Sequence, residues 1–228
     1  MLHSRQIKAI INDFIGNRPH VVHVLIELIN TYPALQPTVP DIFKTYLKLV
    51  QCFDNGNMLF LCGNGGSFAD CLHISGELMK SFIKKRPLSD HDKAPFTELP
   101  HGREIADALE YGFPVLVLGL NHSLFSALEN DNPTRYIGFA QELFNLGKKG
   151  DLLLGISTSG NAQNVIYAAT TARARGLVTI GLTGQNGGQL AKITDVAIRV
   201  PQSATNKAQE LHLPVYHSIC AMIEAHYF

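Results

Sequence analysis

MLFLCGNGGSFADCLHISGEL, residues 58–78, passes from a short apolar run through a glycine-rich loop into a helical pattern. The apolar run at 58–62 is typical of a strand that is buried on both faces of a sheet. The loop at 63–67 contains three glycines, which allow the chain to turn sharply. The residues around 70–82 then predict a helix. Strand, loop and helix in this order indicate the first unit of an α/β fold.

Four further apolar runs follow along the chain, and most of the segments between them predict helices. These runs lie at 114–120, 151–157, 177–184 and 196–200. Continuous apolar runs that alternate with helices favour parallel strands with both faces covered. The sequence therefore predicts an α/β fold with a doubly wound, mostly parallel five-stranded sheet flanked by helices.

The remaining segments complete a single predicted domain over 1–228. Residues 1–56 predict two N-terminal helices, which the proline-rich stretch TYPALQPTVPD separates. Residues 86–112 are polar and proline-rich at first and predict an inserted loop with one short helix over 103–111. The segment 205–228 predicts an amphipathic helix with a kink at Pro214, because proline lacks an N–H group and clashes with the preceding turn.

Composition and charge exclude several classes of protein. The formal net charge is zero, so the chain has no basic surface of the kind that binds nucleic acid. No run approaches the roughly 18 apolar residues of a membrane span, and the first residues do not resemble a signal peptide. The four cysteines fit neither a zinc knuckle nor a disulfide scaffold. We expect a cytoplasmic protein with no nucleic-acid or membrane partner.

Two glycine- and serine-containing loops follow predicted strands and open predicted helices. They lie at 63–67 (GNGGS) and 157–161 (STSGN). Ligands bind at the carboxyl ends of strands in open α/β sheets, and a helix N-terminus favours a phosphate. Neither loop fits a dinucleotide or nucleoside-triphosphate motif. Each alone is explained equally well as a tight turn with a helix cap. Two at equivalent positions favour a shared phosphoester site, whereas the third loop at 183–188 predicts an ordinary turn.

A histidine and a glutamate lie four residues apart on the helix that the first loop opens. His73 and Glu77 therefore share one face and can reach one metal ion or one substrate carbon. The alternative is an exposed His–Glu pair. The C-terminal helix offers four further candidates in QELHLPVYH: Gln209, Glu210, His212 and His217.

The spacing within the C-terminal helix limits which of these residues can act together. Gln209 and His217 are separated by about 12 Å along an ideal helix, which is long for two ligands of one ion. A kink at Pro214 would shorten that distance. His212 lies off the His217 face, and we interpret it as a packing or hydrogen-bonding histidine.

The combination of these groups predicts a reaction class. Two histidines, a carboxylate and an amide suit Zn²⁺ or a similar divalent ion. Such an ion beside a sugar phosphate polarises a carbonyl and stabilises an enediolate. Glu77 and His217 can then move protons between adjacent carbons. The residues thus predict an aldose–ketose isomerase that needs a divalent metal and no redox cofactor.

Five segments together resemble the SIS (sugar isomerase) domain family: CGNGGSFADCLHISGEL, ENDNP, GDLLLGISTSGNAQNVI, GLVTIGLTGQNGG and QELHLPVYH. The likeness covers most of residues 40–228 and is strongest to the phosphoheptose isomerase type. That type interconverts sedoheptulose 7-phosphate and a heptose 7-phosphate. The chain departs from the family pattern at Ala162 and Asn206 and lacks the Gly-Arg pair that usually follows the position of Glu77.

The resemblance implies roles for particular residues. Substrate binding falls to Asn64, Gly65, Gly66, Ser67, Asp131, Ser157, Thr158, Ser159 and Gln209. The implied metal ligands, for a divalent ion that is most often zinc, are His73, Glu77, Gln209 and His217. Glu77 and His217 double as the acid/base pair. The resemblance also implies a homotetramer that is built by the N-terminal helices and shares active sites between chains.

Two other functions are compatible with an SIS fold. Some members are non-catalytic and bind another protein, such as a replication initiator, and the phosphate loops do not distinguish them. The candidate metal ligands favour the enzyme. A sugar-phosphate-sensing regulator usually carries a preceding DNA-binding domain, and the first 55 residues are too few and too neutral for one.

Overall fold

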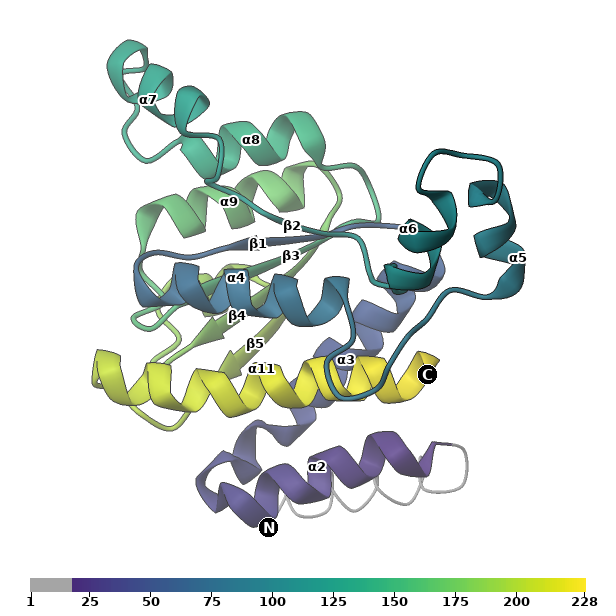
Figure 1. The fold of residues 1–228 in the computed structure, drawn as a ribbon. Helices are drawn as coiled ribbons and strands as arrows, with labels where there is room; N and C mark the ends of the chain where they lie inside the picture. The colour runs from purple at the N-terminus through teal and green to yellow at the C-terminus, as the bar shows by residue number, and fades with distance from the viewer. Residues whose placement is uncertain (1–17) are drawn as a thin grey trace.

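The computed structural model describes residues 18–228, which contain a five-stranded sheet (Figure 1). The strands are β1 (Leu59–Cys62), β2 (Val115–Val117), β3 (Leu152–Ser157), β4 (Val178–Thr183) and β5 (Val196–Arg199). They lie in the order β2-β1-β3-β4-β5, and every neighbouring pair is parallel. All five predicted strands are confirmed. Four are one or two residues shorter than the apolar run, and β2 takes up three of the seven residues at 114–120.

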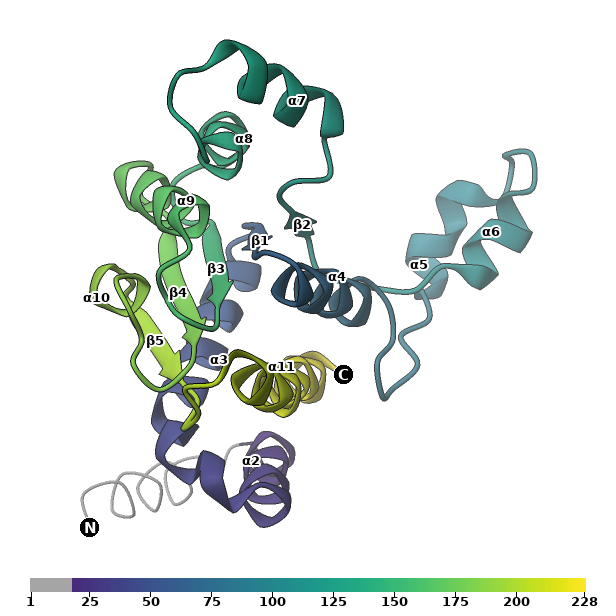
Figure 2. The same cartoon turned by 90° about the vertical axis from the view of Figure 1, so that its left-hand side faces the viewer.

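Side chains of the strands alternate between two cores, one on each face of the sheet. Leu59 and Leu61 join the larger core, whereas Phe60 and Cys62 join the smaller one. The larger core is covered by α3 (Val39–Asp54), α4 (Gly66–Met79) and α11 (Thr205–Tyr227). The smaller is covered by α8 (Gly138–Leu146), α9 (Gln163–Ala174) and α10 (Leu190–Ile193). Figure 2 shows both layers end-on, as the predicted doubly wound fold requires.

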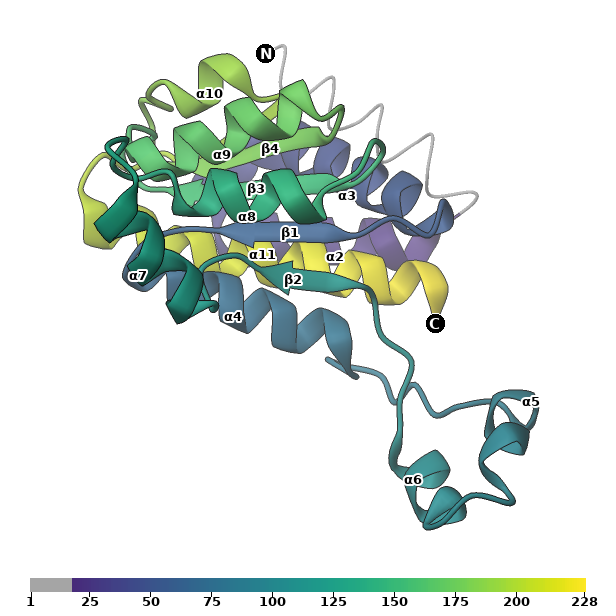
Figure 3. The same ribbon diagram turned by 90° about the horizontal axis from the view of Figure 1, so that it is seen from above.

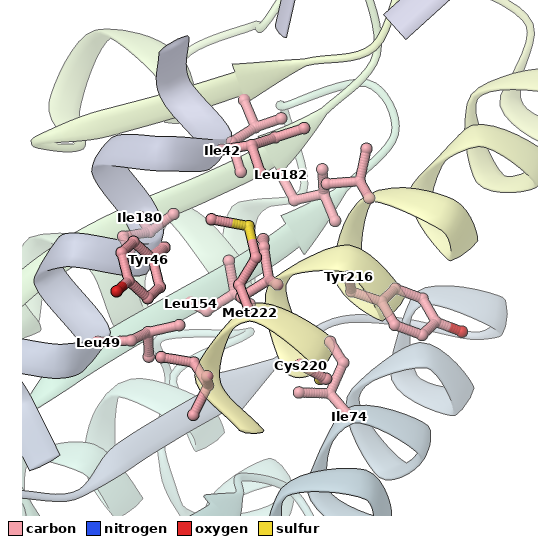
Figure 4. Packing of buried hydrophobic residues seen from close by; sticks show 14 of the residues in the cluster. Ile42, Tyr46, Leu49, Ile74, Leu154, Ile180, Leu182, Tyr216, Cys220 and Met222 are labelled. Carbon is pink, nitrogen blue, oxygen red and sulfur yellow. The ribbon is translucent and has the colours of Figure 1, made fainter. Parts of the chain in front are cut away.

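The helix α3 packs against the five-stranded sheet. Ile42, Tyr46 and Leu49 repeat at helical spacing and are buried against the strands and α11 (Figure 4). Each such side chain stabilises the fold by roughly 1.5–3 kcal/mol. Before it, α2 (Pro19–Thr31) packs along α11, and the 3₁₀ helix η1 (Pro33–Thr38) separates α2 from α3 at the predicted break. The part of the predicted first helix within 1–17 lies outside the described residues, and a role of these helices in oligomerisation stays a prediction.

The helices that carry the candidate site residues differ from the prediction in detail. The helix α4 begins at Gly66, four residues earlier than expected, because Gly65 adopts a positive φ of 54° directly before it. It ends at Met79, where Lys80 is extended. The helix α11 continues unbroken through Pro214 along its whole length.

The stretch at 86–112 stands away from the sheet as a separate arm (Figures 2 and 3). It contains α5 (Asp90–Lys93), η2 (Ala94–Phe96) and α6 (Gly102–Ala108), so it holds more helix than the predicted single segment. An antiparallel bridge between Pro87 and Glu110 closes its base. After β2, α7 (His122–Asp131) leads into α8. Within residues 18–228, no helix combines the length and apolar character that crossing a membrane requires.

The strand order places a topological switch point between β1 and β3. These strands are neighbours in the sheet, but the chain passes from β1 toward β2 on one side and from β3 toward β4 on the other. The loops that follow them therefore diverge and leave a crevice at the carboxyl ends of the strands, where ligands bind in open α/β sheets.

Candidate active site

A reciprocal pair of amide hydrogen bonds joins the first predicted phosphate loop to α9, the helix that follows the second. Asn64 in the first loop donates to Asn164 at 2.8 Å, and Asn164 in the first turn of α9 donates back at 2.7 Å. The first loop and the start of α9 therefore lie side by side at the carboxyl ends of β1 and β3. Asn164 was not among the residues that the sequence singled out.

The first loop aims the start of α4 into this crevice. The first N–H groups of a helix have no partner within the helix and carry partial positive charge, which suits an anion. Asn64, Gly65 and Gly66 are exposed there, whereas Ser67 is buried in the first turn. The structure thus brings these four predicted substrate-binding residues to one helix N-terminus.

The second loop carries three hydroxyl groups, and their exposure to solvent increases along the loop. Ser157 is buried at the end of β3, Thr158 is half-buried and Ser159 is exposed. The hydroxyl of Ser159 accepts a hydrogen bond from the backbone N–H of Asn161 at 3.1 Å. The next position, Ala162, is the N-cap of α9 and supplies no side-chain cap.

Backbone hydrogen bonds from the third loop and the start of α10 hold the second loop in place. The N–H of Gly184 donates to the carbonyl of Thr158 at 2.9 Å, and that of Leu190 donates to Gly160 at the same distance. These are the contacts of a structural turn, which agrees with the interpretation made from its sequence.

The second half of the site is a cluster of His73 and Glu77 on α4 with His217 on α11. The Oε1 atom of Glu77 lies 3.0 Å from Nε2 of His73 and 3.1 Å from Nε2 of His217. One donor atom from each residue lies within 4.8 Å of the other two. The imidazole rings of His73 and His217 are nearly perpendicular, with centroids 5.1 Å apart.

Two polar atoms of this cluster are buried and have no hydrogen-bond partner among residues 18–228. Glu77 is 7% exposed, and its Oε2 has no hydrogen-bond partner among the described residues; nor does Nε2 of His217, despite its close approach to Glu77. Burial lowers the pKa of His217, while the Glu77 carboxylate opposes that shift. Buried polar atoms that lack partners are costly. Two imidazole nitrogens and a carboxylate that converge in this way fit a divalent metal such as zinc.

The other two predicted contributors lie away from this cluster. An added Cβ on Gly66 would lie 2.0 Å from Nε2 of Gln209, and Gln209 also contacts Asp70. Gln209 thus lies at the phosphate-loop end of α4. Asp131 is exposed at the end of α7, where its carboxylate accepts a hydrogen bond from Asn130 at 2.7 Å. Figure 3 shows α7 at the same end of the sheet as the start of α4.

A buried ion pair lies beneath the cluster. Arg86 is fully buried and donates to the backbone carbonyls of Leu78 at 3.1 Å and Glu77 at 3.4 Å. Its guanidinium also contacts Glu224 at 2.8 Å. Arg86 therefore fixes the end of α4 that carries Glu77. By contrast, His212 is a neutral core histidine, as predicted, because burial lowers its pKa to about 4 while a backbone contact to Thr183 opposes the shift.

Comparison with known proteins agrees with the fold and the motifs. The SIS domain family matches residues 114–184. The phosphoheptose isomerase of Aneurinibacillus thermoaerophilus is 36% identical over 177 residues, which are 78% of this chain and 77% of that protein. The phosphoheptose isomerase of a Nitratiruptor species is 34% identical over 206 residues, 90% of this chain and 97% of that protein.

A solved structure with the same fold extends this agreement. The structure of phosphoheptose isomerase from Neisseria gonorrhoeae superimposes with a TM-score of 0.68 at 28% identity and covers 90% of this chain and 97% of the other. These matches cover between 78% and 90% of the chain. The chain belongs to the SIS domain family, in its phosphoheptose isomerase branch.

Proposed function

We propose that this protein is a phosphosugar aldose–ketose isomerase that interconverts sedoheptulose 7-phosphate and a heptose 7-phosphate. The observation that carries the proposal is the convergence of His73 and Glu77 on α4 with His217 on α11, about two turns beyond the N-terminus of α4 that follows the glycine loop. The names of the relatives point to the same reaction.

The two ends of α4 divide the work of binding. Ser67 and His73 are six residues apart, which is about 9 Å along a helix, a length that an open-chain sugar phosphate can span. The phosphate would accept hydrogen bonds from the first turn of α4 and from the hydroxyls of Ser157, Thr158 and Ser159. Asn64, Gly65, Gly66 and Gln209 would contact the sugar chain beside it.

The reacting carbons would then lie at Glu77 and His217. Glu77 takes a proton from C1 of the ketose while His217 donates one to the carbonyl oxygen on C2, which gives an enediol. Glu77 returns its proton to C2, and His217 takes the proton from the oxygen on C1, which gives the aldose. No N–H or O–H group of residues 18–228 donates to the Oε2 atom of Glu77, which remains available for these transfers.

The cluster also suits a divalent metal, which we propose to be zinc. His73, Glu77 and His217 would hold it, with Gln209 as the predicted fourth ligand. Such an ion supplies a positive charge that stabilises the developing negative charge on the sugar oxygens.

The assembly and the location complete the proposal. We infer a homotetramer in which active sites are shared between chains and Asp131 reaches a site, with the N-terminal helices as part of the interface. All four cysteines are free, as a reducing cytoplasm would keep them, which supports a cytoplasmic location.

Turnover and metal content in one preparation test the enzyme against the alternative of a non-catalytic SIS protein that binds another protein. C5 to C7 ketose phosphates are assayed with the purified chain, and bound metal is measured in the same sample. We expect turnover that is fastest with sedoheptulose 7-phosphate and one divalent ion per chain. No turnover with any substrate and no stoichiometric metal would favour the protein-binding alternative.

The variant Glu77→Gln removes the proposed base while preserving its shape. We expect kcat to fall by about 100- to 10,000-fold, the range typical of a general base. Thermal unfolding monitored by circular dichroism serves as the control, since the fold does not depend on the proton transfer. A folded and fully active variant would contradict the role of Glu77.

A further inference from the structure

One buried hydroxyl beside the cluster has no role in the proposed reaction. Tyr216 is 2% exposed, yet its hydroxyl leaves the apolar core and turns toward α4 (Figure 4). It lies 3.0 Å from Nδ1 of His73 and 3.4 Å from Oδ1 of Asp70. A buried tyrosine hydroxyl requires such partners, and here both are polar groups of α4.

The direction of the contact between Tyr216 and His73 depends on which imidazole nitrogen carries the proton. An ionised carboxylate only accepts, so the Tyr216 hydroxyl donates its proton to Asp70. A metal ion bound to Nε2, the atom that lies 3.0 Å from Oε1 of Glu77, requires the lone pair on Nε2 and therefore the proton on Nδ1. In that state Nδ1–H of His73 donates to the oxygen of Tyr216.

We propose that Tyr216 is a positioning residue that relays the Asp70 carboxylate to His73 and so holds the imidazole ready to bind a metal. The proposal rests on the metal site of the proposed function. Metal-binding histidines donate their second N–H to a carboxylate or another acceptor, and this contact sets both the tautomer and the ring orientation. This contact matters for His73, because 48% of its side chain is exposed.

The local sequence explains why Tyr216 can act at this position. It precedes His217 directly on α11, so one turn of that helix delivers both a ligand and the supporting hydroxyl. The Tyr216 ring meets the imidazoles of His73 and His217 edge-on, with centroids 5.5 Å and 5.1 Å away. Asp70 lies one helical turn before His73 on α4 and therefore points to the same side.

A second tyrosine–histidine hydrogen bond, elsewhere in the core, provides a control for the contact between Tyr216 and His73. Tyr46 is also fully buried, and its hydroxyl lies 2.6 Å from Nδ1 of His226. It lies on the opposite side of the same core cluster from Tyr216 (Figure 4). Tyr46→Phe therefore removes a buried Tyr–His hydrogen bond of the same kind without touching the proposed site.

The test measures Zn²⁺ affinity of the whole chain, without substrate, by competition with a chromophoric chelator. We expect Tyr216→Phe to bind Zn²⁺ about 10- to 100-fold more weakly than the wild type, as for other partners of metal-binding histidines. Tyr46→Phe should bind as tightly as the wild type. Should Tyr216→Phe fail to fold, Asp70→Asn replaces it, because a neutral amide is a weaker acceptor and should also lower the affinity.

The outcomes separate this proposal from the one on which it rests. Unchanged affinity in Tyr216→Phe or in a folded Asp70→Asn overturns the relay and leaves the metal site standing. An equal loss in Tyr46→Phe also overturns it, since the effect would then be a general loosening of the core. A wild-type chain that binds no Zn²⁺ overturns both the relay and the metal site.

Discussion

Two buried glutamates, Glu77 on α4 and Glu224 on α11, lie close to the same arginine but have opposite surroundings. Glu224 is 1% exposed and accepts hydrogen bonds from the backbone N–H groups of residues 82, 83 and 84 and from Arg86. Glu77 is nearly as buried, but one of its oxygens has no hydrogen-bond partner in the part of the chain that the structure describes, and the other faces two imidazoles. The two carboxylates therefore differ in their hydrogen-bond partners and not in how deeply they are buried.

This difference indicates that Glu224 stabilises the structure, whereas Glu77 is free to bind a ligand. A carboxylate that is fully surrounded by donors stabilises the structure and has no lone pair left for a ligand. One that is buried and under-satisfied raises the free energy of the protein unless something else binds it. Arg86 joins the two, because it contacts Glu224 and also donates to the carbonyl of Glu77. The satisfied pair thus holds the unsatisfied cluster in place.

The largest expected effect on stability comes from breaking the satisfied pair. Glu224→Gln leaves the Arg86 charge buried without its partner, which costs about 3–5 kcal/mol of unfolding free energy. Urea unfolding of the metal-free chain measures this loss. Glu77→Gln is the matched control on the neighbouring helix and should change the same quantity by far less. Equal losses in the two variants would remove the distinction between the glutamates.

Metal binding should stabilise the protein through Glu77. At a free Zn²⁺ concentration of 100 times Kd, binding to the folded state adds about 2.7 kcal/mol to the unfolding free energy. Thermal unfolding with and without Zn²⁺ measures the gain, which we expect to disappear in Glu77→Gln. A gain of the same size in that variant would place the metal at another site.

The smallest expected effect is a loss of unfolding free energy at low pH, caused by protonation of Glu224. Burial acts to raise the pKa of this carboxyl, but the backbone donors of residues 82–84 and Arg86 outweigh it and hold the pKa below the ordinary value of 4.5. A lowered folded-state pKa means that the stabilisation is complete above pH 4.5 and is lost as the pH falls through the lower, folded-state value.

Urea unfolding at a series of pH values below 6 tests this dependence. The wild type should lose stability more steeply on acidification than Glu224→Gln, which lacks the titrating group. Parallel profiles for the two proteins would show that the stabilisation comes from elsewhere.

The sheet and the positions of the two glycine- and serine-containing loops could be predicted from local sequence. A buried parallel strand is a continuous apolar run, and a glycine loop directly precedes its helix. The start of α4 was misplaced by four residues, since glycines at 65 and 66 favour a loop in sequence, while Gly66 is already helical. The contacts of Asp70, Tyr216 and Asn164 form between helices and loops that are far apart in the sequence. The spacing of residues along the chain therefore does not predict them.

The predicted ligand set shows the same limit. His73 and Glu77 are one turn apart, so their proximity follows from helix geometry alone. The approach of His217 depends on the packing of α11 against α4. The eight-residue separation of Gln209 from His217 on an unbroken helix places Gln209 beside Gly66.

The narrow base of the arm at 86–112 has a consequence for how this protein tolerates change in length. The bridge between Pro87 and Glu110, together with the bond from the N–H of Tyr111 to the carbonyl of Arg86, brings the two ends of the arm together. The entropy of closing such a loop grows only with the logarithm of its length. Residues can therefore be gained or lost beyond the bridge at small thermodynamic cost, while Arg86, at its foot, must stay where it is.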